Sequence, residues 1–441
     1  MESVKEIQVK SPLGFRTKLS SWLNGFDTGC LLDSNSIADT TKGQKDKYSS
    51  YDFICAAGAM AELVVNQDNG AFEEMKKFYE EQKGWLFGFL SYDLKNDVEE
   101  LVSKNTDHIG MPSLHFFKPK YLFIIKGHKV KLLGHGETAK ELNDVLDQIK
   151  AQKPCNKFQS TVKLKSRISK SAYIEKVSKI KQHLQYGDIY EMNFCQEFYA
   201  SAIEIDPIGA FHKLNSLSQT PFACYYRVRD RHLLCGSPER FLKKDGNKLI
   251  SQPIKGTAGR GHDDQSDQML KDSLLKDPKE QSENVMIVDL VRNDLSRTAL
   301  KGSVQVEELF GIYPFKQMYQ MISTVTSELN SGVHLVDAIR IAFPMGSMTG
   351  APKVRAMELI EDYESTKRGL YSGAVGYITP EGDFDFNVVI RSILYNHQKQ
   401  YLSAMVGGAI TVQSIPEKEY DECLLKAKPL FNTLNSSVNG K

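Results

Sequence analysis

The 441-residue sequence has almost no excess of charge, because 56 basic residues stand against 55 acidic residues for a net charge of +1. Proteins that bind nucleic acid or anionic membranes usually carry a basic excess, so this balance argues against both partners. No run approaches the ~18 apolar residues of a membrane span, and the first residues lack the apolar core of a signal peptide. These absences predict a cytoplasmic protein that binds any anionic ligand at a local positive site.

Paired cysteines are also absent. The seven cysteines are scattered along the chain, without a CxxC pair or a cysteine–histidine cluster at zinc spacing. Most stand among apolar residues, where a free thiol behaves as a small core residue. We therefore expect free thiols in a reducing compartment. The Gly-x4-Gly-Lys spacing of an ATP-binding loop is missing as well.

What remains is the composition of a soluble globular protein, 41% apolar and 25% charged. Strand-like runs dominate, at residues 30–35, 52–57, 85–93, 121–125, 129–133, 193–199 and 223–228. An amphipathic helix is predicted to begin after Ser169 and to end at Gly187. Because strands and helices do not alternate regularly, the pattern favours an α+β fold with antiparallel sheets. A polar, lysine-rich stretch at 151–167 predicts a linker between region 1–160 and region 165–435.

The most informative stretch is Pro253-Ile254-Lys255-Gly256-Thr257. A short strand is expected at 248–252, and Gly256 is expected to break it, which places Lys255 at a junction between strand and loop. Burial there would lower the pKa of the lysine and free its amine as a nucleophile or base. A solvated edge lysine is the ordinary alternative for any lysine that stands alone.

Two pairs of glutamates provide possible metal ligands. Asp277 and Pro278 predict a helix start with Glu280 completing a capping box, and Glu280 and Glu283 then share one face. Glu419 and Glu422 repeat this spacing near the C-terminus, with Lys426 one turn later. Two such pairs could converge on Mg²⁺, which takes one or two carboxylates and keeps several waters. Solvated helix faces are the alternative.

Several motifs in a fixed order carry a resemblance to a known family. They are Pro253-Ile254-Lys255-Gly256-Thr257, Ser237-Pro238-Glu239-Arg240-Phe241, the run from Glu283 to Asp294, and Gly350-Ala351-Pro352-Lys353. Together they resemble the chorismate-utilising enzymes, and within that family the aminodeoxychorismate synthase branch, densely over 165–435 and loosely before. The resemblance implies two large orthogonal antiparallel sheets with helices outside and a central active-site cleft. Anthranilate synthases are similar but carry alanine in the position of Lys255.

The same resemblance implies a reaction of chorismate with ammonia. Glu283 and Glu422 would bind Mg²⁺ on the ring carboxylate, and Glu280 and Glu419 would act through water or support the ligands. Lys255 would attack C2 and form a covalent intermediate, which ammonia resolves at C4. Glu239 would act as the general acid or base for the C4 hydroxyl, with a pKa raised by burial; a salt bridge to Arg240 is its alternative.

Further residues are expected to hold the dianionic substrate. Arg391 is predicted on a strand that points it into the cleft, where it can clamp a carboxylate. The backbone N–H groups at Gly407 and Gly408 could form a nest for the other carboxylate. The segment 346–350 before Pro352 has a second anion-binding geometry. The resemblance adds Thr257, Tyr371, Lys353 and Lys426 as substrate contacts.

Two positions depart from the family pattern. Gln320 stands where many relatives have histidine, and Glu191 where amino-transferring relatives have glutamine. Isochorismate and salicylate synthases have lysine at the latter position to activate water, so its absence here argues against water as the nucleophile. The segment 31–34 resembles the tryptophan-binding segment of anthranilate synthases, although a buried strand is the preferred interpretation.

No Cys-His-Glu amidotransferase signature is present, so use of glutamine would require a separate glutamine amidotransferase subunit as partner. Two other functions stay open at this point. One is anthranilate synthase component I, which also eliminates pyruvate. The other is a regulator that binds chorismate or tryptophan without turnover.

Overall fold

Strands and helices are mixed along the whole chain in the computed structural model, which describes residues 2–36, 46–154, 158–316 and 318–436. The strands are β1 (Glu2–Gln8), β2 (Thr28–Asp33), β3 (Phe53–Val65), β4 (Leu86–Leu90), β5 (Leu114–Lys126), β6 (Lys129–His135), β7 (Lys165–Ser166), β8 (Glu191–Ser201), β9 (Phe222–Val228), β10 (Arg231–Ser237), β11 (Arg240–Asp245), β12 (Lys248–Gln252), β13 (Ile254–Gly259), β14 (Gln305–Pro314), β15 (Met318–Glu328), β16 (Gly350–Ala351), β17 (Ala374–Ile378), β18 (Phe384–Asn387), β19 (Ser392–Asn396) and β20 (Tyr401–Ile410). The helices are α1 (Pro12–Leu23), α2 (Ala71–Gln82), α3 (Lys95–Val98), α4 (Ala139–Ala151), α5 (Lys170–Tyr186), α6 (Pro207–Ser218), α7 (Asp264–Lys276), α8 (Pro278–Ser296), α9 (Leu335–Ala342), α10 (Lys353–Tyr363) and α11 (Pro416–Thr433), with short 3₁₀ turns η1 (Tyr92–Leu94) and η2 (Gly346–Met348).

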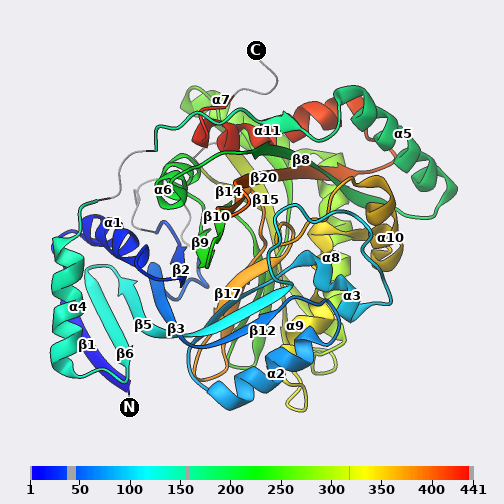
Figure 1. Cartoon of the computed structure of the whole chain (residues 1–441). Helices are drawn as coiled ribbons and strands as arrows, with labels where there is room; N and C mark the ends of the chain where they lie inside the picture. Colours follow the sequence, from blue (N-terminus) through cyan, green and yellow to red (C-terminus); the bar gives the residue numbers. More distant parts are fainter. Residues whose placement is uncertain (1, 37–45, 155–157, 317, 437–441) are drawn as a thin grey trace.

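Every strand pairing in the described residues is antiparallel, and the pairings join the strands into one continuous network. Followed from strand to strand, this network runs β15–β12–β11–β18–β17–β4–β5–β3–β2–β9–β10–β19–β20–β8. Strands from the N-terminal region therefore form its middle, between β17 and β9. Helices lie on its outside (Figure 1). The predicted α+β architecture with antiparallel sheets and outer helices is confirmed.

Local signals in the sequence identify several elements correctly. The Ser169 side chain accepts a hydrogen bond from the amide of Ala172 at the start of α5, and Gly187 ends the helix in the left-handed conformation. Tyr173, Val177 and Ile180 form its buried face, as the spacing predicts. The hairpin of β5 and β6 turns at Gly127 and His128, also as predicted.

The stretch predicted to be a linker is packed against the core where the structure describes it. Phe158, Val162 and Leu164 are buried in the same apolar cluster as α11, and the amide of Val162 donates to the carbonyl of Leu434. The described part of the candidate linker, residues 158–164, is therefore packed against the domain through three apolar side chains.

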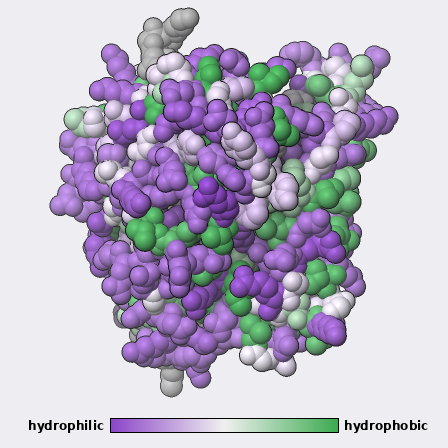
Figure 2. Space-filling model, turned by 90° about the vertical axis from the view of Figure 1, so that its right-hand side faces the viewer, coloured by the Kyte–Doolittle hydropathy of each residue, from purple (hydrophilic) through white to green (hydrophobic). Residues whose placement is uncertain are grey.

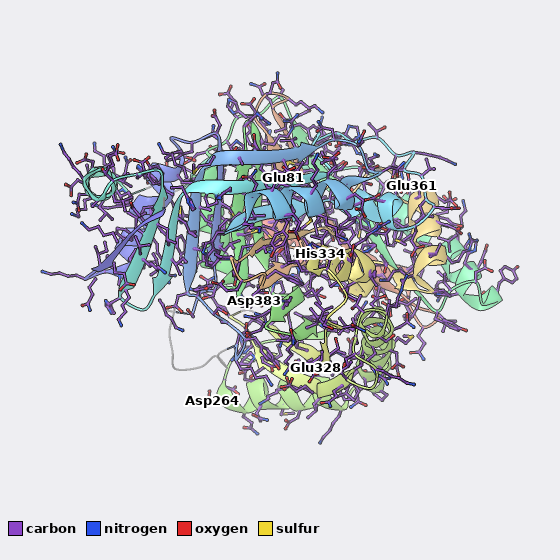
Figure 3. All side chains as sticks on the ribbon, turned by 90° about the horizontal axis from the view of Figure 1, so that it is seen from below. Glu81, Asp264, Glu328, His334, Glu361 and Asp383 are labelled. Atoms are coloured by element: carbon purple, nitrogen blue, oxygen red, sulfur yellow. The ribbon has the colours of Figure 1, made fainter. Side chains whose placement is uncertain are left out.

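The cysteines in the described residues are free and buried, as predicted; Cys155 lies outside the described residues. On the face seen in Figure 2 hydrophilic side chains predominate, and hydrophobic ones gather in smaller groups. Within the described ranges, no helix is long and apolar enough to cross a membrane. On the lower side of the molecule (Figure 3), α2 packs beside α9, and His334 before α9 pairs with Glu80 of α2 at 2.9 Å.

Lys255 lies inside a strand, not at the junction that the sequence predicts. β12 is followed by Pro253 and then by β13, which pairs with β15. Ile254 lies opposite Ile322 and Thr257 opposite Gln320, so Lys255 and Gly256 together face the single residue between them. This is a β-bulge, with Gly256 in the left-handed region at φ +98°. Gly256 therefore does not break the strand; it makes the bulge that re-aims Lys255.

The bulge requires glycine, which generates a first prediction. A Cβ on residue 256 would lie 3.1 Å from Met321 Cβ and 3.2 Å from Glu280 Oε2, in a backbone conformation that L-residues avoid. Gly256→Ala should lower the free energy of unfolding by about 1–3 kcal/mol in urea titration. Gly259→Ala is the matched control, because a Cβ on this residue of the same strand would meet open space. Equal stability of the two variants would contradict the constraint.

Candidate active site

A cavity of about 760 Å³ opens beside the β13 bulge. Its wall combines β13, the start of α8, the end of β20 and the inner face of α11. Eleven of the predicted site residues line it, namely Lys255, Glu239, Thr257, Tyr371, Arg391, Gly407, Lys426, Glu280, Glu283, Glu419 and Glu422. Residues more than 180 positions apart in the sequence thus meet in one site.

Two predicted substrate contacts are not among the residues that line the cavity. The ammonium of Lys353 forms an ion pair with Asp294 at 2.7 Å, with both side chains mostly buried, which joins α10 to α8. Gly408 lies beside the cavity, next to the glutamates of α11: a Cβ there would lie 3.5 Å from Lys426 Nζ and 3.8 Å from Glu419 Oε2, which is ordinary contact.

Lys255 is held in an ion pair. Its Nζ donates to Glu191 Oε1 at 2.5 Å, and both side chains are almost fully buried. Burial acts to lower the pKa of Lys255, but the carboxylates of Glu191, Glu283 and Glu239 outweigh it, and its pKa is raised above the ordinary value. The expectation of a lowered pKa was wrong, because that reasoning counted desolvation and omitted the neighbouring anions. Lys255 is an ammonium ion in this state.

The backbone of Lys255 is fixed from the side of α8. Asn284 Nδ2 donates to the Lys255 carbonyl at 3.3 Å, and Asn284 Oδ1 accepts from Ser323 Oγ of β15 at 2.6 Å. The Ser323 hydroxyl oxygen in turn accepts from the amide of Phe310. One amide side chain therefore ties the bulge to the helix that carries Glu280 and Glu283.

Glu239 is buried in the cavity wall and makes no ion pair with its neighbour Arg240. Arg240 binds Asp385 and Asp46 instead, at 2.9 and 2.8 Å. Burial raises the pKa of Glu239 to about 7, although the hydroxyl of Ser347 and the charges of Lys255 and Arg391 oppose the rise. The alternative of a salt bridge to Arg240 is excluded, and the raised pKa is confirmed. This carboxyl can donate or accept a proton near neutral pH.

The four glutamates of α8 and α11 share the cavity with two lysines. Lys426 Nζ donates to Glu422 Oε1 at 2.7 Å, and its charge lowers the pKa of Glu422. Lys279 Nζ lies 3.6 Å from Glu283 Oε1. Burial raises the pKa of Glu283 to about 7, and it also raises the pKa values of Glu280 and Glu419.

This donor set fits a hard cation. No three carboxylate, imidazole or thiol groups converge into a cage within the residues that the structure describes. Mg²⁺ needs only one or two protein carboxylates, however, because waters and substrate complete its shell. Glu283 Oε1 is buried and has no hydrogen-bond partner, and burial raises its pKa although Lys255 and Lys279 lie nearby.

Arg391 lines the cavity, but it does not lie within a strand whose alternation points it there, as was predicted. β18 ends at Asn387, and Arg391 stands just before β19 in the left-handed region at φ +52°. Nearby, β20 pairs with β19 only as far as Ser403, although it pairs with β8 through Ile410. Alternate N–H groups on that free edge have no strand partner, in agreement with an anion site near Gly407.

Several polar wall residues were not predicted as site residues, among them Lys279, Asn193 and Ser347. Lys279 stands within the motif next to Glu280, and the search for carboxylates passed over it. Asn193 and Ser347 line the cavity together: Asn193 Nδ2 donates to the Ser347 carbonyl at 3.0 Å, and Ser347 opposes the rise in the pKa of Glu239. The 346–350 segment, which was expected to bind an anion, thus contributes Ser347 to the cavity wall. Gln320 also lines the wall, with its buried Oε1 lacking a hydrogen-bond partner.

The sequence profile of the chorismate binding enzymes matches residues 34–432. The chain belongs to this family. It is 34% identical over 356 residues to aminodeoxychorismate synthase component 1 of Salmonella typhimurium (strain LT2), which covers 80% of this chain and 77% of that protein. It is 31% identical over 366 residues to anthranilate synthase component 1 of Thermus thermophilus, which covers 81% and 79%.

Solved structures of chorismate binding enzymes agree with the fold. Anthranilate synthase component I from Streptococcus pneumoniae superposes with a TM-score of 0.78 at 25% identity and covers 88% of this chain and 94% of that one. The menaquinone-specific isochorismate synthase of Escherichia coli superposes with a TM-score of 0.76 at 16% identity, covering 98% and 95%. The curated relatives are thus divided between two amino-transferring activities.

The pKa of Glu239 generates a second prediction. Because its folded-state pKa of about 7 lies above the usual 4.5, its stabilising contribution is complete below about pH 4.5 and is lost as the pH rises through about 7. Glu239→Gln removes this loss and should be more stable than the wild type at about pH 8, by up to about 3 kcal/mol, with little difference at about pH 4. Urea unfolding at both pH values measures it. A pH-independent difference would contradict the raised pKa.

Proposed function

We propose that this chain is an aminodeoxychorismate synthase component 1, which converts chorismate and ammonia to 4-amino-4-deoxychorismate through a covalent intermediate on Lys255. The observation that carries the proposal is the position of Lys255: its Nζ lies in the cavity wall, in contact with Glu191, beside an acid with a pKa of about 7. The relatives named aminodeoxychorismate synthase component 1 support the assignment.

In the first half-reaction Lys255 must lose a proton, and the Glu191 carboxylate that accepts its hydrogen bond takes it. The lysine nitrogen then forms a bond to C2 of chorismate, both conjugated double bonds of the ring shift, and the C4–O bond breaks. Protonated Glu239 gives its proton to the leaving hydroxyl, which departs as water. A pKa of about 7 leaves a large share of Glu239 protonated at neutral pH.

In the second half-reaction ammonia forms a bond to C4, and the bond from C2 to the lysine nitrogen breaks. Ionised Glu239 takes the surplus proton from the new ammonium group and returns to its acid form. Lys255 recovers its proton from Glu191. Both acid–base groups end where they began.

The substrate is a dianion, and the site offers local positive charge in a protein with almost none in excess. Arg391 and the free edge of β20 near Gly407 would hold one carboxylate. Tyr371 and Thr257 line the same wall. Mg²⁺, held by Glu283 and Glu422 with Glu280 and Glu419 in support, would supply positive charge for the ring carboxylate. In its absence the lysines at 279 and 426 offset part of the glutamate charge.

Ammonia would come from a glutamine amidotransferase subunit, the partner that the designation component 1 of the relatives suggests. A second candidate function is anthranilate synthase component 1, because relatives with that name have similar identity and coverage. The two activities differ in product. Aminodeoxychorismate keeps the enolpyruvyl group, whereas anthranilate has lost pyruvate.

Replacement of Lys255 gives the third prediction. With chorismate, Mg²⁺ and ammonium, Lys255→Ala should lose product formation by about 10³-fold or more while it still binds chorismate. Loss of the lysine also leaves the Glu191 carboxylate buried without its cation, so Lys255→Arg, which keeps the charge, is measured beside it. Lys248→Ala on the adjacent strand β12, where the lysine is exposed, is the control.

Mass spectrometry of the products distinguishes the candidates. Aminodeoxychorismate from the wild type, with loss of activity in both Lys255 variants, agrees with the proposal. Anthranilate as the main product would move the chain to the other branch. Unchanged turnover in Lys255→Arg would exclude the covalent lysine.

A further inference from the structure

A second buried ion pair lies directly behind the cavity wall. Arg368 and Glu364 are 2% and 5% exposed, and they bind in a bidentate manner, with Nε to Oε2 at 2.9 Å and Nη2 to Oε1 at 2.6 Å. Glu364 caps the C-terminal end of α10. Figure 3 labels Glu361, which lies on the same helix one turn before Glu364. Neither residue is among those that line the cavity.

The remaining hydrogen bonds of the pair all go to segments of the cavity wall. Arg368 Nη1 donates to the carbonyl of Met348 at 2.6 Å, and Nη2 donates to the carbonyl of Asn193 at 2.9 Å. Nη1 also reaches Ser372 Oγ at 3.4 Å. Glu364 Oε1 accepts from the amide of Cys195 at 2.9 Å. The pair therefore holds η2, β8 and the turn before β17 at once.

In each of these segments a residue that lines the cavity is the hydrogen-bonded residue itself or its neighbour in the chain. Ser347, which lines the cavity with Glu239 and opposes the rise in its pKa, precedes Met348, and Asn193 lines the cavity and donates to the Ser347 carbonyl. Tyr371 precedes Ser372, a non-glycine residue in the left-handed region at φ +64°. Such a backbone is strained and persists only where surrounding contacts hold it.

A buried arginine–glutamate pair is a poor source of stability, because its desolvation cost is comparable to its attraction and apolar residues could replace it. It is well suited to setting geometry, since the planar guanidinium directs its N–H donors along fixed lines. Here those donors bond the carbonyl oxygens of Met348 and Asn193 and the hydroxyl oxygen of Ser372, all in one wall of the cavity. We propose that Arg368 and Glu364 are positioning residues, which hold Ser347, Asn193 and Tyr371 in register in the cavity wall that contains the general acid Glu239.

The proposal rests on the proposed function only in that Glu239 acts as the acid on chorismate. It predicts a loss in kcat larger than any change in KM, because the acid is displaced while Arg391 and the free edge of β20 stay in place. Displacement of catalytic groups by about 1 Å costs on the order of 10²-fold in rate. A merely structural role would lower stability and the amount of folded enzyme without changing the pH profile.

The experiment measures chorismate consumption by Arg368→Lys as a function of pH. Its kcat should fall at least about 10-fold, because lysine cannot keep the forked bonds to Met348 and Asn193. The alkaline limb should move to higher pH, since a displaced Ser347 no longer opposes the rise in the pKa of Glu239. Ser347→Ala should move this limb in the same direction, and the double variant should show no further shift, because both changes break one connection.

Arg167→Lys is the matched control. Arg167 binds the buried Glu197 of the same strand β8 at 2.8 Å and does not line the cavity, so its pH profile should match the wild type. Should Arg368→Lys fail to fold, Glu364→Gln serves in its place, because it keeps the side-chain shape and changes only the charge. Wild-type kcat and pH profile in a folded Arg368→Lys or Glu364→Gln would overturn the proposal, as would fully additive effects with Ser347→Ala.

Consumption of chorismate is followed instead of the identity of the product. A result of anthranilate in place of aminodeoxychorismate therefore rejects the proposed function and leaves the positioning role standing. Aminodeoxychorismate as the product, together with a wild-type pH profile in Arg368→Lys, rejects the positioning role and leaves the proposed function standing. The two failures are distinguishable in one set of assays.

Discussion

The ion pair between Lys255 and Glu191 joins the two ends of the strand network. β13, which carries Lys255, belongs to one end through β15, and β8, which carries Glu191, forms the other. Neither charge could be buried alone, because an isolated ammonium or carboxylate in the protein interior costs several kcal/mol. Formation of the pair therefore requires the two ends to meet. The N-terminal strands in the middle of the network decide whether they do.

The charges around this pair explain why the cavity is reactive. Glu283 and Glu239 add negative charge near Lys255 and hold it as an ammonium ion, while burial raises both of their own pKa values to about 7. The buried carboxyl groups of the site thus outnumber the positive charges beside them. A dianionic substrate alone would increase this deficit, and a divalent cation would relieve it. Glu283, which helps to hold Lys255 as an ammonium ion, is also one of the ligands that we propose for the cation.

Behind the groups that line the cavity, buried polar side chains fix the direction of the backbone. Asn284 fixes the carbonyl of Lys255 from α8, and the bulge at Gly256 turns the lysine toward β8. On the opposite wall, Arg368 and Glu364 do the same for η2, β8 and the turn at Tyr371. Lys255 lies in the bulged strand β13, Asn193 in β8 and Ser347 in η2, and each segment accepts a hydrogen bond from a buried polar side chain. The packed sheet makes the site rigid, and these few hydrogen bonds orient the side chains that line the cavity.

The sequence by itself was sufficient for the features that depend on near neighbours. The cap at Ser169, the helix start at Asp277 and the two glutamate pairs follow from spacing alone, and the order of motifs identifies the family. Tertiary structure decided what depends on distant partners. Glu280 does not close a capping box, since the amide of Asp277 donates to Leu274 and the Glu280 carboxylate faces the cavity. Local reasoning also could not predict three other features. They are the direction of the pKa shift of Lys255, the ion pair of Lys353 with Asp294, and the hydrogen bonds of Arg368 to the cavity wall. Each is a balance of charge and burial between residues far apart in the chain, and such a balance exists only once the sheet has brought them together.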